Sequence, residues 1–358
     1  MINGNRIMPN IGLSFFTNIF YGIPLNRKYI FIPLLIFVTL SSLLFSIVQV
    51  KSLQWEDKIT LETGLMLFVY GLIFFTASFE ASNHLFFYTG TGKMLIKKYG
   101  LTKGFVLEIS NKNVSAIQAL FCCITGLTST CYSCTRDMLK TSHYISEAYA
   151  WFGAAYFLYD IWSMYVVQVA VDKDNSKNDL ANGSMNNGLT HSIETERDAN
   201  VNSTSFLSKF WIFVKTNPVI VGHHVFVGGF GFLVITYLRG GLGDCFFGFV
   251  YLMEASTPFV SMRSIISKMG FKNSRFYVLN GILMMISFFV FRVLMWPLVM
   301  LLYAYSIKTG YFEAIYSLPR GCKISILILM LPQLYWFFLI VKGATQLGMA
   351  KRKKKKAM

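Results

Sequence analysis

Eight long apolar runs decide what this chain can fold into. They lie near residues 30–50, 64–81, 114–132, 148–170, 218–238, 242–260, 278–305 and 323–341. A helix of about 20 apolar residues crosses about 30 Å of hydrocarbon. The sequence therefore predicts an all-α polytopic membrane protein with about seven or eight transmembrane helices. The pattern leaves open whether the first run crosses the bilayer fully.

The composition excludes an ordinary soluble domain. Only 14% of the residues are charged and the mean hydropathy is +0.50, whereas about a quarter of the residues in soluble domains are charged. A net charge of +16 would indicate nucleic acid as the partner of a soluble protein. Here the basic residues lie mostly between the apolar runs, so we expect membrane lipids as partners and no nucleic acid.

The distribution of Lys and Arg predicts the orientation. If the N-terminus is cytosolic, 24 of the 33 Lys and Arg residues lie on the cytosolic side, eight lie on the opposite side, and Arg292 lies within a run. Cytosolic loops carry an excess of Lys and Arg. Both termini are therefore predicted to be cytosolic.

The chain divides into three parts. Residues 1–60 form an N-terminal segment with one transmembrane helix, residues 61–345 a membrane domain, and residues 346–358 a basic cytosolic tail. Within the domain, residues 171–207 are predicted to be a flexible cytosolic loop, because Asn, Ser and Gly dominate and too little apolar surface is present to fold alone.

The tail ends in Lys355-Lys356-Ala357-Met358. It resembles the dilysine address that the coat-protein retrieval machinery reads when membrane proteins return from the Golgi to the endoplasmic reticulum. Alternatively, the lysines contact anionic headgroups without a receptor. The address is favoured, which predicts a multi-pass protein of the endoplasmic reticulum that cycles through the Golgi.

Ionisable side chains within the runs are the candidates for chemistry, because such groups are costly in lipid. Four lie at similar depth: His223 and His224 about 8 Å, and Asp160 and Glu254 about 12 Å, from the cytosolic boundary. A carboxylate that orients a His allows general acid–base catalysis near neutral pH. The alternative is that these groups form a structural network.

Other polar positions favour structural roles. Arg292 is expected to pair with Asp244 or to extend toward the lumenal boundary. Cys131 and Cys134 have a spacing found in zinc sites but no second ligand pair. They are predicted to be lumenal, as a disulfide or as two idle thiols, and no metal site is predicted.

Several segments resemble the TLC-domain family, which groups translocation-associated membrane proteins, Lag-type ceramide synthases and ceroid-lipofuscinosis membrane proteins. The segments are Val221-Gly-His-His-Val-Phe226, Leu238-Arg-Gly-Gly-Leu-Gly-Asp-Cys-Phe-Phe-Gly248, Leu252-Met-Glu-Ala-Ser-Thr-Pro-Phe-Val-Ser261, Tyr159-Asp-Ile-Trp-Ser-Met-Tyr165, Val278-Leu-Asn-Gly-Ile-Leu283 and Pro332-Gln-Leu-Tyr-Trp-Phe337. They are similar to the ceramide-synthase-like branch, the type-three TLC domain-containing proteins. The resemblance implies a six-helix membrane bundle around a lipid-accessible cavity, preceded by one or two further helices.

The resemblance also implies a function in sphingolipid and ceramide homeostasis. Ceramide synthases use a His pair, which His223 and His224 match, to transfer an acyl group from acyl-CoA to a sphingoid base. They carry a later segment with a His-Asp step and a further Asp. Here that segment begins at Glu254 and keeps one acidic residue.

Two classes of function remain open. In a ceramide synthase-like acyltransferase, the His pair takes the amine proton, Asp160 or Glu254 orients it, and Lys268 and Lys272 attract the phosphates of acyl-CoA, the co-substrate. No bound cofactor is expected. In the alternative, a non-enzymatic protein binds a lipid or a cargo protein in the same cavity and regulates lipid composition. The retained His pair favours the first class, and the missing His-Asp step favours the second.

Overall fold

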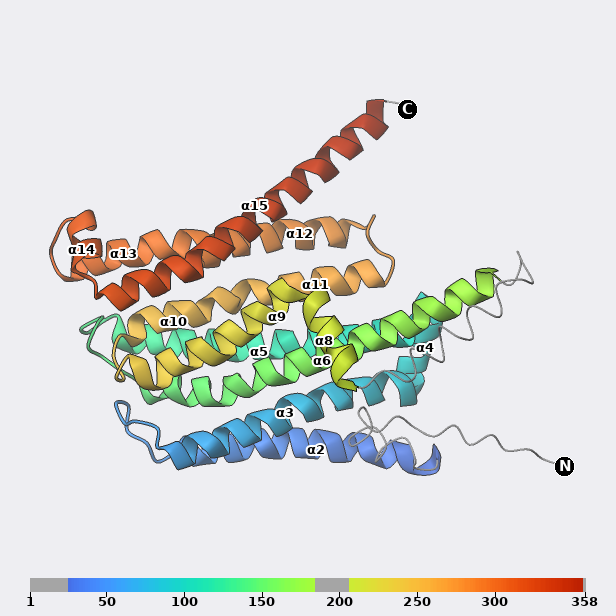
Figure 1. Ribbon diagram of the computed structural model, residues 1–358, viewed down its shortest axis with the longest axis horizontal. Helices are drawn as coiled ribbons and strands as arrows, with labels where there is room; N and C mark the ends of the chain where they lie inside the picture. The colour runs from blue at the N-terminus through green and yellow to red at the C-terminus, as the bar shows by residue number, and fades with distance from the viewer. Residues whose placement is uncertain (1–24, 184–205, 357–358) are drawn as a thin grey trace.

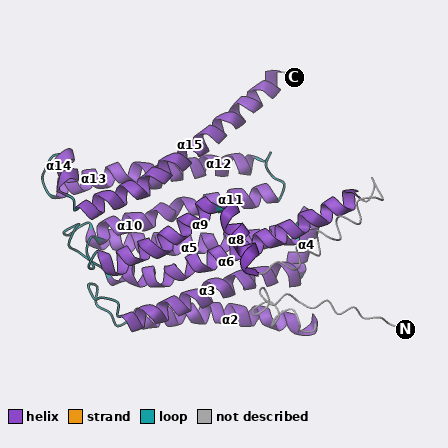
Figure 2. Ribbon diagram, viewed as in Figure 1, coloured by secondary structure: helices purple, strands orange, loops and turns teal. Residues whose placement is uncertain are grey.

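The computed structural model describes residues 25–183 and 206–356, and within these ranges the chain forms helices and no strand (Figure 2). The α-helices are α2 (Leu25–Val50), α3 (Leu61–Tyr88), α4 (Gly90–Tyr99), α5 (Lys103–Ser133), α6 (Tyr144–Gly183), α8 (Phe206–Thr216), α9 (Pro218–Val225), α10 (Asp244–Leu252), α11 (Thr257–Lys268), α12 (Arg275–Phe288), α13 (Met295–Ser306), α14 (Tyr311–Ser317) and α15 (Arg320–Lys356). Four short irregular segments continue them: the π-helical η1 (Phe226–Gly231), η2 (Val234–Leu238) and η4 (Phe289–Leu294), and the 3-10 helix η3 (Met253–Ser256).

All eight apolar runs are helices long and apolar enough to cross a membrane, which confirms the predicted all-α membrane fold. The helices α3 and α5 extend well beyond their apolar runs. Thr60 and Thr102 cap them by accepting hydrogen bonds from the backbone N–H of Thr63 and Phe105. Hydropathy alone missed these polar turns, because the start of a helix is set by side-chain hydrogen bonds that a hydropathy pattern does not detect.

The spans lie side by side and their connections gather at two ends (Figure 1). The termini end carries the start of α2, the helix α4, the α11–α12 turn and the end of α15. The opposite end, here called the disulfide end, carries the α2–α3, α5–α6 and η2–α10 connections and α14. This alternation matches the order of sides that the charge pattern predicts.

Apolar side chains lie both on the outer surface of the helix bundle and in its core. Phe37, Leu40 and Leu44 of α2 are exposed, as a lipid-facing stripe must be. Between α3, α5 and α6, aromatic residues such as Phe75 and Tyr159 pack into one core, and a second core lies around α10, α13 and α14. Small residues allow the closest helix approach, because a Cβ on Gly126 of α5 would lie 2.6 Å from the carbonyl oxygen of Gly248 in α10.

The predicted flexible loop, residues 171–207, is wrong at both ends. Its last two residues begin α8. The helix α6 continues to Gly183, so residues 171–183 are helical. Adding residues to an existing helix is easier than nucleating one, and the backbone N–H of Gly104 donates to Asp174 at 2.7 Å, which ties this extension to α5. Residues 184–205 lie outside the described part of the chain, as do the side chains of Lys355 and Lys356, although the α15 backbone reaches Lys356.

Candidate functional site

A cavity of about 590 Å³ lies between six of the spans. Its lining residues come from α5, α6, the α9–η2 span, the α10–α11 span, the α12–α13 span and α15, and none come from α2 or α3. Toward the disulfide end the wall is apolar and aromatic, with Tyr149, Phe232, Ile235, Phe247 and Val250. The ionisable lining residues lie farther toward the termini end, so the cavity has a polar part and an apolar part.

The structure brings all four predicted site residues to this cavity. His224 and Asp160 form a close pair, with Nε2 of His224 2.7 Å from Oδ2 of Asp160. Asn111 of α5 donates from Nδ2 to Oδ1 of Asp160 at 2.6 Å and to Ser163 at the same distance. Asn111 was not among the predicted site residues, and its position on the same helix face as Gln118, seven residues later, is the sequence signal that could have indicated it.

The hydrogen bonds of His224 fix its protons. Its Nδ1 lies 2.8 Å from the carbonyl oxygen of Ile220, which can only accept, so Nδ1 carries a proton. One further proton must lie between Nε2 and Asp160, because a bare nitrogen lone pair would repel a carboxylate at 2.7 Å. Whichever partner holds that proton, the pair has no net charge. Both ring nitrogens of His224 are therefore occupied.

His223 differs from its neighbour. Its ring lies edge-on to His224, with centroids 5.7 Å apart, and edge-on to Trp336 of α15, with centroids 5.2 Å apart. No described residue forms a hydrogen bond with it, and it lines the cavity. The π-helical η1 begins shortly after it, at Phe226, and such segments occur often at functional sites. His223 is thus the imidazole with nitrogens open to a ligand.

Arg292 holds the second charged pair of the cavity. Its guanidinium donates to Glu254 at 3.2 Å, to the hydroxyls of Ser256 and Thr257 at 2.8 and 3.0 Å, and to Gln333 at 3.2 Å. The predicted pairing with Asp244, or extension to the boundary, is therefore wrong. The α10–α11 span brings Glu254 nearer, and Arg292 gains four partners without leaving the bundle.

The structure does not bring the two predicted CoA-binding lysines to the cavity. Lys268 pairs with Glu108 at 3.0 Å, and Lys272 is exposed in the α11–α12 turn; neither lines the cavity. Lys112 does line it. The apolar run of that span begins near residue 114, so hydropathy places Lys112 in the loop before it, whereas α5 begins at Lys103.

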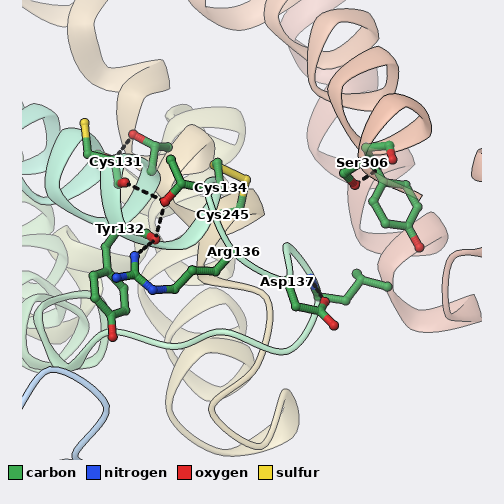
Figure 3. The surroundings of a disulfide bond; sticks show 12 residues. Cys131, Tyr132, Cys134, Arg136, Asp137, Cys245 and Ser306 are labelled. Carbon is green, nitrogen blue, oxygen red and sulfur yellow. Dashed lines mark hydrogen bonds between the residues drawn. A yellow bond between two sulfur atoms is a disulfide. The ribbon is translucent and has the colours of Figure 1, made fainter. Parts of the chain in front are cut away.

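The two cysteines of the predicted lumenal motif behave differently. Cys134 forms a disulfide with Cys245, and Cys131 is a free, exposed thiol (Figure 3). The bond joins the end of α5 to the start of α10. Cys245 reaches it because Gly240, Gly241 and Gly243 adopt positive φ angles and turn the chain sharply after η2. Neither predicted state of the motif is correct: Cys131 and Cys134 are not paired with each other, and only Cys131 is a free thiol.

Comparison with known protein families finds the TLC domain over residues 108–342. That range covers four of the six spans that line the cavity completely and most of the other two, α5 and α15, and α2, α3 and α4 precede it. No solved structure matches the chain. The matched range covers more than half of the chain and contains His223, His224, Asp160 and Glu254, so the protein belongs to the TLC domain family.

Proposed function

We propose that this membrane protein acts in lipid homeostasis as an acyltransferase, in which His223 takes the proton of the attacking group. Membership of the TLC domain family supports a function in lipid metabolism or homeostasis. The observation that carries the enzymatic proposal is the contrast between the two histidines: His224 is locked by Asp160 and Ile220, and His223 faces the cavity without a hydrogen-bond partner among the described residues.

The reaction that fits is transfer of an acyl group from acyl-CoA to the amine of a sphingoid base. The neutral amine attacks the thioester carbonyl, the C–N bond forms and the C–S bond breaks. His223 removes the proton from the nitrogen and delivers it to the departing thiolate, which leaves as CoA thiol. Edge-on ring contacts with His224 and Trp336 hold the His223 ring in place.

The shape of the cavity supports a lipid substrate. Its volume of about 590 Å³ lies within the range of about 300–1,000 Å³ typical of small-molecule sites. Its apolar part suits a hydrocarbon chain, and its polar part suits the reacting head.

A second candidate function is non-enzymatic lipid binding. The observation that favours it is the position of Glu254, whose carboxylate accepts hydrogen bonds from Arg292 and Thr257 and does not orient either histidine. In that case the cavity holds a lipid and influences membrane composition without turnover.

We further propose that the protein resides in the endoplasmic reticulum with both termini cytosolic and is retrieved through Lys355 and Lys356. The disulfide supports this orientation, since disulfides persist in oxidising compartments and this one lies at the end opposite to the start of α2 and the end of α15. Changing both lysines to Ser should release the protein to later compartments. Unchanged residence in the endoplasmic reticulum would refute the retrieval proposal.

The activity is tested with purified protein in nanodiscs, labelled long-chain acyl-CoA and a sphingoid base. His223→Ala should lower turnover by about 10²- to 10⁴-fold, while lipid still co-purifies because the apolar wall is unchanged. Lys140→Ser, an exposed position at the disulfide end, should react like the native protein. Equal product from native protein and His223→Ala contradicts a catalytic His223. Absence of product for several acyl chains, with lipid still bound, favours the non-enzymatic alternative.

A further inference from the structure

The charges around the cavity do not cancel. Asp160 and His224 together have no net charge, as their hydrogen bonds require. Glu254 and Arg292 form a second neutral pair. Among the described residues that line the cavity, Lys112 is the one remaining fixed charge, and it is positive.

Lys112 lies at the depth of the reacting groups. It follows Asn111, whose side chain donates to Asp160, so the stem of Lys112 begins at the level of the Asp160–His224 pair. No hydrogen bond or ion pair joins its ammonium to any residue in the described ranges. Asp160 already has two close partners, His224 and Asn111.

Lys112 is partly buried, lines the cavity and has no partner among the described residues. Such a position is unfavourable for an ammonium, because charges removed from water are normally paired and hydrogen-bonded. One negative charge is missing to balance Lys112, and the cavity wall toward the disulfide end is apolar. An apolar ligand that carries its own anionic group would supply the missing partner. A ligand whose head carries only a positive charge would add to the imbalance.

We propose, as an extension of the proposed function, that the cavity binds a ligand with a phosphate group and that Lys112 is the residue that binds this phosphate. The phosphate can belong to a single-chain phospholipid or to the CoA part of an acyl donor. In both cases the hydrocarbon chain lies along the apolar wall. The Lys112 ammonium donates charge-assisted hydrogen bonds to the phosphate oxygens, which positions the ligand beside His223.

The test measures equilibrium binding in phosphatidylcholine nanodiscs, with empty nanodiscs as background. Three labelled probes share one acyl chain: a lysophosphatidate, the uncharged monoacylglycerol and a non-reactive thioether analogue of the acyl-CoA. Native protein is compared with Lys112→Met, Lys112→Arg and Lys97→Met. Lys97 is an exposed lysine of α4 outside the cavity and serves as the control for a general loss of positive charge.

Lys112→Met should weaken binding of at least one phosphate-bearing probe by about tenfold or more. Monoacylglycerol binding should stay within about twofold of native, and Lys112→Arg should retain most of the phosphate affinity, because a guanidinium also binds phosphate. If Lys112→Met weakens binding of the lysophosphatidate alone, the natural ligand is a lipid phosphate. If it weakens binding of the CoA analogue alone, Lys112 binds the CoA phosphates.

Three results overturn the proposal: unchanged binding of both phosphate probes in Lys112→Met, an equal loss for the uncharged probe, or the same loss in Lys97→Met. The thermal midpoint of Lys112→Met, and the retained binding of Lys112→Arg, separate a folding defect from a binding defect. No turnover occurs in this assay, because the thioether analogue is non-reactive and no cleavable acyl donor is present. The binding result therefore stands or fails independently of turnover.

Discussion

Two polar clusters within the bundle have similar residue types and different surroundings. At the disulfide end, Asp244 is fully buried, pairs with Arg239 and accepts the backbone N–H of His143 at 2.5 Å. Arg239 also donates to the carbonyl oxygens of Ile235 and Leu242 and to Ser146. In the cavity, by contrast, His223 and Lys112 have no hydrogen-bond partner among the described residues.

The difference separates polar residues that stabilise this bundle from polar residues that can bind or react with a ligand. In the cluster at the disulfide end, Arg239 and Asp244 form hydrogen bonds with each other and with neighbouring protein groups, and a disulfide joins α10, which begins at Asp244, to the end of α5. The cavity cluster is open, because polar atoms of His223 and Lys112 face space that a ligand can fill. We therefore expect substitutions at the disulfide end to reduce stability, and substitutions of the open cavity residues to reduce binding or turnover.

The largest expected loss of stability is that of Asp244→Ala. It leaves the guanidinium of Arg239 buried without its carboxylate, which costs about 3–5 kcal/mol of unfolding free energy. The measurement is thermal or denaturant unfolding of the purified protein. Lys140→Ala removes an exposed pair with Asp137 and leaves the backbone hydrogen bonds of Asp137 in place, so it should cost less than about 1 kcal/mol. Similar losses in both variants would refute the contrast between a buried and an exposed pair.

The next largest effect is expected from Cys134→Ser. It opens the bond to Cys245, which closes a sequence separation of 111 residues; such bonds contribute about 2–4 kcal/mol. Its thermal midpoint should fall and become insensitive to a reductant, whereas the native midpoint should fall when reductant is added. Cys131→Ser, which leaves the disulfide intact, serves as the control and should match the native protein under both conditions.

Within the cavity, Arg292→Met should cost about 1.5–3 kcal/mol, the usual range for hydrogen bonds to a charged group. The loss should be smaller than for Asp244→Ala, because the side chain of Glu254 is 29% exposed and the freed carboxylate can be hydrated. Adding Glu254→Gln should restore part of the stability by removing the unpaired charge. If the double variant is less stable than Arg292→Met, the ion pair is not what stabilises this region.

The smallest effect concerns pH and the loop between α5 and α6. Burial lowers the pKa of His143 below its usual 6.5, with Asp244 opposing the shift, and Nδ1 of the neutral ring accepts the N–H of Ile145 at 3.1 Å. The unfolded chain therefore binds this proton at higher pH than the folded one. Stability from His143 is complete above about pH 6.5 and falls as the pH drops from there through the lower folded pKa.

The measurement for His143 is the thermal midpoint between pH 7.5 and 5.5. The native midpoint should decrease across this window by more than that of His143→Asn, which has no group that titrates there. An identical decrease in both proteins would assign the pH dependence to other residues.

Most of the fold could be predicted because hydropathy is a local property. Each of the eight apolar runs is a span, and the His pair is visible because the two residues are adjacent. The helical continuation of α6 through residues 171–183 could not be predicted from composition. Its tie to α5 through Gly104 and Asp174 joins residues 70 positions apart.

The partners within the cavity were decided by the tertiary structure alone. Sequence spacing placed Asp160, His223, His224 and Glu254 at a common depth but could not pair them, because depth leaves the rotation of each helix about its axis undetermined. That rotation directs Asp160 to His224 and Glu254 to Arg292. It also turns Lys112, counted with the loop by hydropathy, into the cavity. The sequence determined which segments enter the membrane, since transfer to lipid depends on each segment by itself. Packing between helices determined which polar groups meet and which remain open to a ligand, because that depends on faces contributed by several spans at once.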